Sequence, residues 1–199
     1  MPSFPSTELL RGLRRDTEEL IRIADREFVP LTAEKLLWKP APDKWSVAQC
    51  LEHLNRYGLH YLPAMQTRID DALARGSRPE PTFRAGWLGD FFVRTVQPRH
   101  TGSARANLKY PSPKAYDPNR TGTTTAAALP AFLRQQQTTL ELLERAQRVN
   151  LEAIRVPISI TNLIQLRLGD CLRFVIVHNQ RHVQQAMKVV ERLASGKVG

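Results

Sequence analysis

Residues 170–194 read DCLRFVIVHNQRHVQQAMKVVERLA, and the rest of the chain is organised around this segment. Its apolar residues recur at steps of three and four, the spacing of one face of an α-helix: Leu172, Val175, Ile176, Val183, Met187, Val190 and Leu193. Asp170 follows a glycine and is a suitable N-cap. We therefore expect a long amphipathic helix that begins at Gly169-Asp170.

This helix carries two histidines, His178 and His182, that lie one turn apart on one face. That spacing lets two imidazoles converge on one metal ion. Both residues border the apolar stripe, so they should point inward, where an imidazole needs a partner. Hydrogen bonds to neighbouring polar groups would satisfy the pair equally well. A metal would need a third ligand from elsewhere, and the H-E-x-x-H motif of zinc proteases does not occur.

The length of 199 residues predicts one domain over residues 1–199, and 42% hydrophobic residues suffice for a core. No apolar run reaches transmembrane length, and the first residues lack a signal-peptide pattern. We therefore expect a cytoplasmic protein without a membrane partner. The two cysteines, Cys50 and Cys171, lie on apolar helical faces, which favours reduced buried thiols.

The net charge of +10 raises the question of a nucleic-acid partner. The basic residues are spread along the chain, however, and no basic cluster interleaved with aromatic residues occurs. We therefore expect a solvated basic surface and no specific binding of nucleic acid.

Three further segments have the apolar spacing of long helices: Thr7 to Phe28, Val47 to about Arg75, and Thr125 to Val149. Together with the last helix they predict an all-α four-helix bundle. Between the second and third helices, residues 76–123 contain repeated prolines and predict a long irregular insertion, with a short helix around Trp87 to Val96. Alternating apolar residues after position 153 allow an extended stretch, which we expect to be too isolated to form a sheet.

The start of the second helix is marked by Ser46-Val47-Ala48-Gln49, a capping box. Trp38 and Trp45 precede it and are expected to seal one end of the core. His53 lies on the shoulder of this helix's apolar stripe, and His60 points in nearly the same direction. His100, within the insertion, is a weak candidate for a metal ligand.

Residues 38–54 read WKPAPDKWSVAQCLEHL and resemble the signature of DinB-like domains, in which a W-S segment followed by H-L opens the second helix and supplies a metal-binding histidine. The second signature of that family, H-x-x-x-H in the last helix, is matched by His178 and His182. Arg181 and the glutamines at 184 and 185 are most similar to the DinB_2 branch. The resemblance spans about residues 7–193.

This resemblance implies a four-helix bundle with up-down-down-up order and a divalent metal ion, zinc or nickel being favoured, held by His53, His178 and His182. Relatives include thiol transferases, a mycothiol-dependent isomerase and proteins described as metal-dependent hydrolases. The implied function is a metal-dependent hydrolase or thiol transferase acting on a small molecule, with a low-molecular-weight thiol as a candidate partner. No general acid or base is identified. The alternative is a non-catalytic, stress-related bundle protein that binds a metal or small ligand. A homodimer is also compatible with the resemblance.

Overall fold

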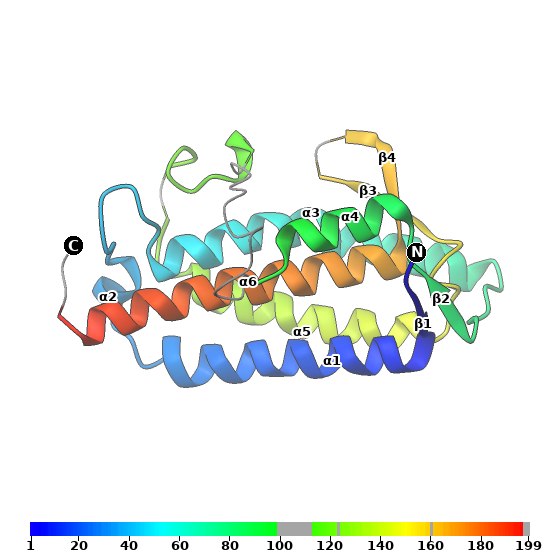
Figure 1. Cartoon of the computed structure of the whole chain (residues 1–199), viewed down its shortest axis with the longest axis horizontal. Coiled ribbons are helices and arrows are strands. Elements are labelled where there is room, and N and C mark those ends of the chain that lie inside the picture. The colour runs from blue at the N-terminus through cyan, green and yellow to red at the C-terminus, as the bar shows by residue number, and fades with distance from the viewer. Residues whose placement is uncertain (99–112, 123, 160, 197–199) are drawn as a thin grey trace.

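The computed structural model describes residues 1–98, 113–122, 124–159 and 161–196 (Figure 1). Four long helices dominate it: α1 (Ser6–Ile23), α3 (Val47–Ala74), α5 (Ala128–Ala146) and α6 (Leu168–Ala194). The shorter elements are α2 (Ala33–Leu37), α4 (Trp87–Val96), a π-helical turn η1 (Ala24–Phe28) and a 3₁₀ turn η3 (Lys114–Tyr116). The predicted all-α class is confirmed, because the described residues are mostly helical with only four short strands.

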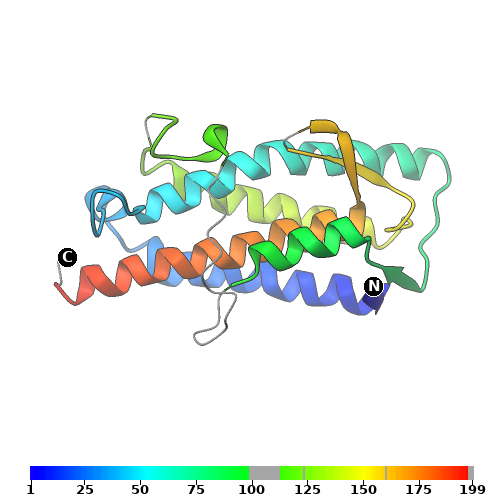
Figure 2. The same ribbon diagram turned by 45° about the horizontal axis from the view of Figure 1, so that its top comes forward.

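The four long helices lie side by side in both views (Figures 1 and 2). Helix α3 contacts α5 and α6, and α1 contacts the same two helices. Their apolar faces form two buried clusters, one represented by Leu13, Met65 and Leu172, the other by Leu51, Phe132 and Val183. Buried polar side chains lie between these clusters along the helices: Thr17, His53, Asn55, Gln136, Thr139, His178, Asn179 and His182. The long helices thus enclose a polar middle layer within an otherwise apolar core.

The start of α3 follows the predicted capping box. The Gln49 amide N–H donates to Ser46 Oγ at 3.1 Å, and the Ser46 amide N–H donates to Gln49 Oε1 at 3.1 Å. Both bonds satisfy amide groups that a helix N-terminus leaves without internal partners. This local device fixes where α3 begins and therefore where His53 lies along it.

The predicted N-cap of α6 is wrong. The structure begins α6 at Leu168, with Arg167 at the N-cap position and no side-chain cap. The Asp170 carboxylate instead accepts from the Gly86 amide at 2.8 Å and from Arg173 at 3.2 Å. Arg173 also donates to Asp90 of α4 at 3.1 Å. The buried carboxylate of Asp170 therefore holds α4 against α6. Asp170 makes these tertiary contacts and does not cap its own helix.

The expectation that the extended stretch after residue 153 forms no sheet is also wrong. Strands β3 (Arg155–Ile158) and β4 (Thr161–Arg167) pair antiparallel, with Val156 opposite Leu166. The partner strand comes immediately next in the chain, and Val156, Ile158 and Leu166 are buried in the core. A second small sheet pairs β1 (Ser3–Pro5) with β2 (Thr82–Arg84). Burial of Val156, Ile158 and Leu166 stabilises the β3–β4 hairpin, which would be marginal alone.

The expected irregular insertion contains more regular structure than predicted. Its described part includes β2, η3 and the predicted helix α4, which contacts α6 (Figure 2). His100 lies outside the described residues. Within those residues, no helix combines the length and apolarity that crossing a membrane requires.

Candidate metal centre

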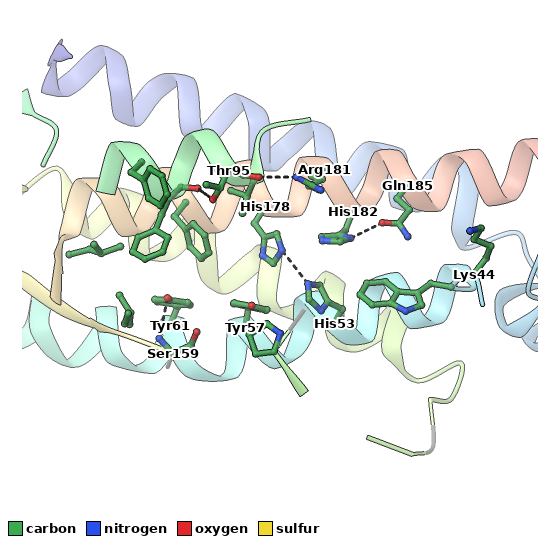
Figure 3. Close-up of a pocket in the computed structure, with 18 of the residues that line it drawn as sticks. Lys44, His53, Tyr57, Tyr61, Thr95, Ser159, His178, Arg181, His182 and Gln185 are labelled. Carbon is green, nitrogen blue, oxygen red and sulfur yellow. Dashed lines mark hydrogen bonds between the residues drawn. The ribbon is translucent and has the colours of Figure 1, made fainter. Parts of the chain in front are cut away.

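Three histidines converge in the polar middle layer: His53 from α3, and His178 and His182 from α6 (Figure 3). Their candidate ligand nitrogens all lie within 4.8 Å of one another, and the Nε2 atoms of His53 and His178 are 3.2 Å apart. Helix α6 supplies two of them because positions four apart share one face. Packing of α3 against α6 places the third histidine, His53, beside these two. These three buried histidines could hold a metal ion.

Burial keeps the three imidazoles neutral. Their exposed fractions are 3% for His53, 6% for His178 and 9% for His182. Loss of hydration lowers the pKa of His53 to about 4 and lowers the pKa of His178 and His182 well below 6.5. The charge of neighbouring Arg181 lowers all three further. At neutral pH each ring therefore carries one nitrogen lone pair, which a metal ligand requires.

Hydrogen bonds determine which nitrogen carries that lone pair. His53 Nδ1 lies 2.6 Å from the carbonyl oxygen of Tyr116, which can only accept, so Nδ1 carries the proton. His182 Nδ1 lies 3.0 Å from Gln185 Oε1, which fixes the same tautomer. Both residues therefore offer Nε2 to the shared site. Outer hydrogen bonds of this kind orient metal-binding histidines.

Aromatic rings enclose the triad. The Trp45 ring centroid lies 4.9 Å from that of His53 and 5.6 Å from that of His182. The Tyr57 ring packs edge-on against His178 at 4.6 Å. Trp45 packs against the apolar cluster of Leu51, Phe132 and Val183, in agreement with the expectation that it seals the core, and it also lies directly against the candidate ligands. These rings keep the imidazoles away from bulk water and limit their rotation.

A cavity of about 790 Å³ opens beside the triad. All three histidines line it, and Figure 3 shows them with its other lining residues. Most of its wall is aromatic or aliphatic, contributed by residues such as Tyr61, Phe92 and Phe174. Burial raises the pKa of Tyr61 to about 12, so its phenol stays protonated at neutral pH. The site therefore combines a set of neutral nitrogen ligands with space for a small, largely apolar molecule.

Most of the chain matches one known protein family. A model of the DinB superfamily, DinB_2, matches residues 10–186. The chain belongs to the DinB superfamily. The match spans both signature segments and all three histidines of the cavity wall. No curated protein and no solved structure matches the chain significantly.

Other polar residues of this DinB-superfamily chain lie outside the triad. His60 is half-buried, and its Nε2 lies 3.3 Å from the carbonyl oxygen of Pro157, which agrees with a structural role. Glu52 pairs with Arg56 at 3.0 Å on the adjacent turn of α3. Among the described residues, the three histidines are the single group of histidine, cysteine or acidic residues arranged to hold an ion.

Two supports of the DinB-superfamily site were not predicted from the sequence. The Tyr116 carbonyl belongs to the main chain of η3, so no side-chain pattern could have indicated it. Gln185 was noted only as part of the family signature, although its position three residues after His182 places both on one helix face.

Proposed function

We propose that this protein is a metal-dependent enzyme that activates a small thiol, or water, for attack on a small-molecule substrate. The observation that carries the proposal is the opening of three buried, neutral imidazoles onto a cavity of about 790 Å³. Zinc and nickel are the proposed ions, because imidazole nitrogen suits both.

The number of ligands favours catalysis over a structural role for the ion. Structural zinc sites commonly use four protein ligands, whereas catalytic sites use three and keep one position open. Among the described residues, the possible ligand group consists of three histidines, and no fourth histidine, cysteine or acidic residue belongs to it. The open position would face the cavity, since all three histidines line it.

The surroundings of the triad favour a thiol over water as the nucleophile. A divalent ion held there would lower the pKa of a thiol or of water and polarise a carbonyl group. An unassisted thiol has a pKa of about 8.5, whereas bulk water has a pKa of about 15.7. Among the described residues that line the cavity, the single carboxylate is Asp43, which lies 2.7 Å from the ammonium group of Lys44. A thiol depends less than water on a carboxylate base, so thiol transfer is the preferred reaction and hydrolysis the second.

We also propose the up-down-down-up helix order for this chain. The colour gradient in Figure 1 supports it, because α1 and α6 run towards one end of the molecule while α3 and α5 run towards the other. In this order the contacting helices α3 and α6 run antiparallel.

The proposed function is tested by turnover with defined nucleophiles. The zinc- or nickel-loaded protein would be assayed for conjugation of glutathione, bacillithiol or mycothiol to chlorodinitrobenzene. In that reaction the thiol sulfur bonds to the ring carbon, chloride leaves and the thiol proton passes to solvent. Hydrolysis of a nitrophenyl ester would be measured in parallel. We expect metal-dependent conjugation that is lost in His178→Ala and kept in His60→Ala, whose histidine lies outside the triad. Absence of metal-dependent turnover in both assays would favour the non-catalytic alternative.

A further inference from the structure

The candidate metal centre has a fixed positive charge in its cavity wall. Arg181 lines the cavity and precedes His182 directly on α6. It also lies three residues after His178, which places the two side chains about one helical turn apart. The described charged residues of the wall are Lys44, Arg181 and Asp43, so two positive groups and one negative group leave a net charge of +1.

The position of the Arg181 guanidinium is held from both sides. Its backbone belongs to α6, and its Nη1 donates to the carbonyl oxygen of Thr95, near the end of α4, at 2.9 Å. Figure 3 shows this bond, with Arg181 beside His178 and His182. Arg181 and all three histidines line the same cavity. The guanidinium therefore faces the same space as the proposed ion.

The other residues of the cavity wall favour a ligand with an apolar part. Phe92 and Phe174 face the cavity from α4 and α6, and Tyr57 faces it from α3. Ring centroids of Phe92 and Phe174 lie 6.3 Å apart, and those of Tyr57 and Phe174 lie 6.2 Å apart. Such rings bury a flat apolar group well, but they offer little to a strongly hydrated one. A ligand that is charged throughout would lose its hydration there without compensation.

We propose that the substrate of this site is a small aromatic or aliphatic monocarboxylic acid. Arg181 binds its carboxylate, because the planar guanidinium matches that group with paired hydrogen bonds. The apolar part of the substrate lies against Phe92 and Phe174, and its reactive atom faces the three histidines. The inference deepens the proposed function by giving the substrate class of the same site.

The test compares a carboxylic acid with its uncharged amide. Phenylacetate and phenylacetamide have the same ring and nearly the same shape, and chemical-shift titration measures weak affinities for both. Both are titrated into the zinc-loaded protein and into the metal-free protein at neutral pH. We expect phenylacetate to bind at least about tenfold more tightly than phenylacetamide in both forms, the size expected of one charge-assisted hydrogen bond.

Arg181→Gln should remove most of this preference and change the affinity for phenylacetamide by less than about twofold. Lys188→Gln is the matched control, because it removes one positive charge from an exposed position of α6 outside the cavity wall. It should leave both affinities unchanged. Thermal denaturation checks that both variants are folded, and the comparison of acid with amide in the wild-type protein requires no variant.

Equal affinity for acid and amide, or no measurable binding of phenylacetate, would overturn the proposal. So would a preference that persists in Arg181→Gln or vanishes in the metal-free protein, because the carboxylate would then be bound elsewhere. The metal-free titrations need no ion, so a failure here is distinguishable from a failure of the protein to bind metal or to turn over a thiol.

Discussion

The Nε2 atoms of His53 and His178 lie 3.2 Å apart, although 125 positions separate the two residues in the chain. The Tyr116 carbonyl holds the proton of His53 on Nδ1, so His53 Nε2 presents a lone pair. A second lone pair at that distance would repel it. In the metal-free protein His178 Nε2 must therefore donate a proton to His53, and binding of a cation by His178 Nε2 would require that proton to move to Nδ1. Protonation and binding of the proposed ion would therefore both act at this contact.

The first prediction concerns the acid stability of the metal-free protein. The folded-state pKa of His53 is about 4, below the value near 6.5 of an exposed histidine. As the pH falls below about 6.5, the unfolded chain therefore takes up protons first, and the free energy of unfolding decreases until the pH reaches about 4. His53 alone should contribute a loss on the order of 3 kcal/mol. Urea denaturation at a series of pH values measures it.

The matched variant for this prediction is His53→Gln, which cannot gain a proton in this range. Its unfolding free energy should fall less steeply with acid than that of the wild type. Equal slopes for the two proteins would mean that His53 is not the group responsible.

The second prediction concerns the outer support of His182. Gln185 Oε1 accepts from His182 Nδ1 at 3.0 Å and orients the ring. Gln185→Leu should weaken metal affinity by roughly tenfold or more, the usual effect of losing such a support. Gln184→Leu is the control, because Gln184 is exposed on the adjacent position. Competition with a chelator measures both constants, and equal affinities for the two variants would exclude the orienting role.

The third prediction concerns the contact that holds α4 over the cavity. A Cβ atom added at Gly89 would overlap the side chain of Asp170. Gly89→Ala should therefore lower the free energy of unfolding by about 1–3 kcal/mol. A Cβ at Gly12 of α1 meets nothing within 4 Å, so Gly12→Ala should raise stability by roughly 0.5–1 kcal/mol through helix propensity. If both substitutions stabilise the protein, α4 does not pack against α6 as described.

The fourth prediction concerns the capping box of α3. Ser46→Ala removes an acceptor at 3.1 Å from the Gln49 amide and should cost about 1 kcal/mol. Thr32→Ala is the comparison, because Thr32 caps the five-residue helix α2 with a longer bond of 3.4 Å. Chemical denaturation should show the larger loss for Ser46→Ala. An unchanged midpoint in that variant would argue against the cap.

Features encoded locally were predictable from the sequence. The capping box needs only Ser46 and Gln49, and the apolar spacing of the long helices needs only neighbouring turns. The side-chain periodicity placed His53 and His178 on the shoulders of their stripes, and the structure brings them together. The family signatures supplied the choice of His53 over His60, which periodicity alone left open because both point in nearly the same direction.

Features that depend on distant partners were not predictable. Asp170 has the residue type of an N-cap, but Gly86 and Arg173 compete for its carboxylate once α4 packs on α6. Strand β4 carries exposed apolar residues, Leu163 at 93% exposure and Ile164 at 40%, so its sequence lacks a simple alternation. The Tyr116 carbonyl is a main-chain group, and any residue at that position could provide it.

We propose that His53, His178 and His182 bind one divalent ion together. The most direct measurement is the metal content per chain of identically prepared wild type, the three single alanine variants of the triad, and His60→Ala. We predict a single zinc or nickel ion per chain in the wild type and in His60→Ala, and a strong loss in each triad variant, because two ligands bind an ion weakly. Triad variants that retain metal as well as the wild type, or loss of metal only in His60→Ala, would exclude a shared site of these three histidines.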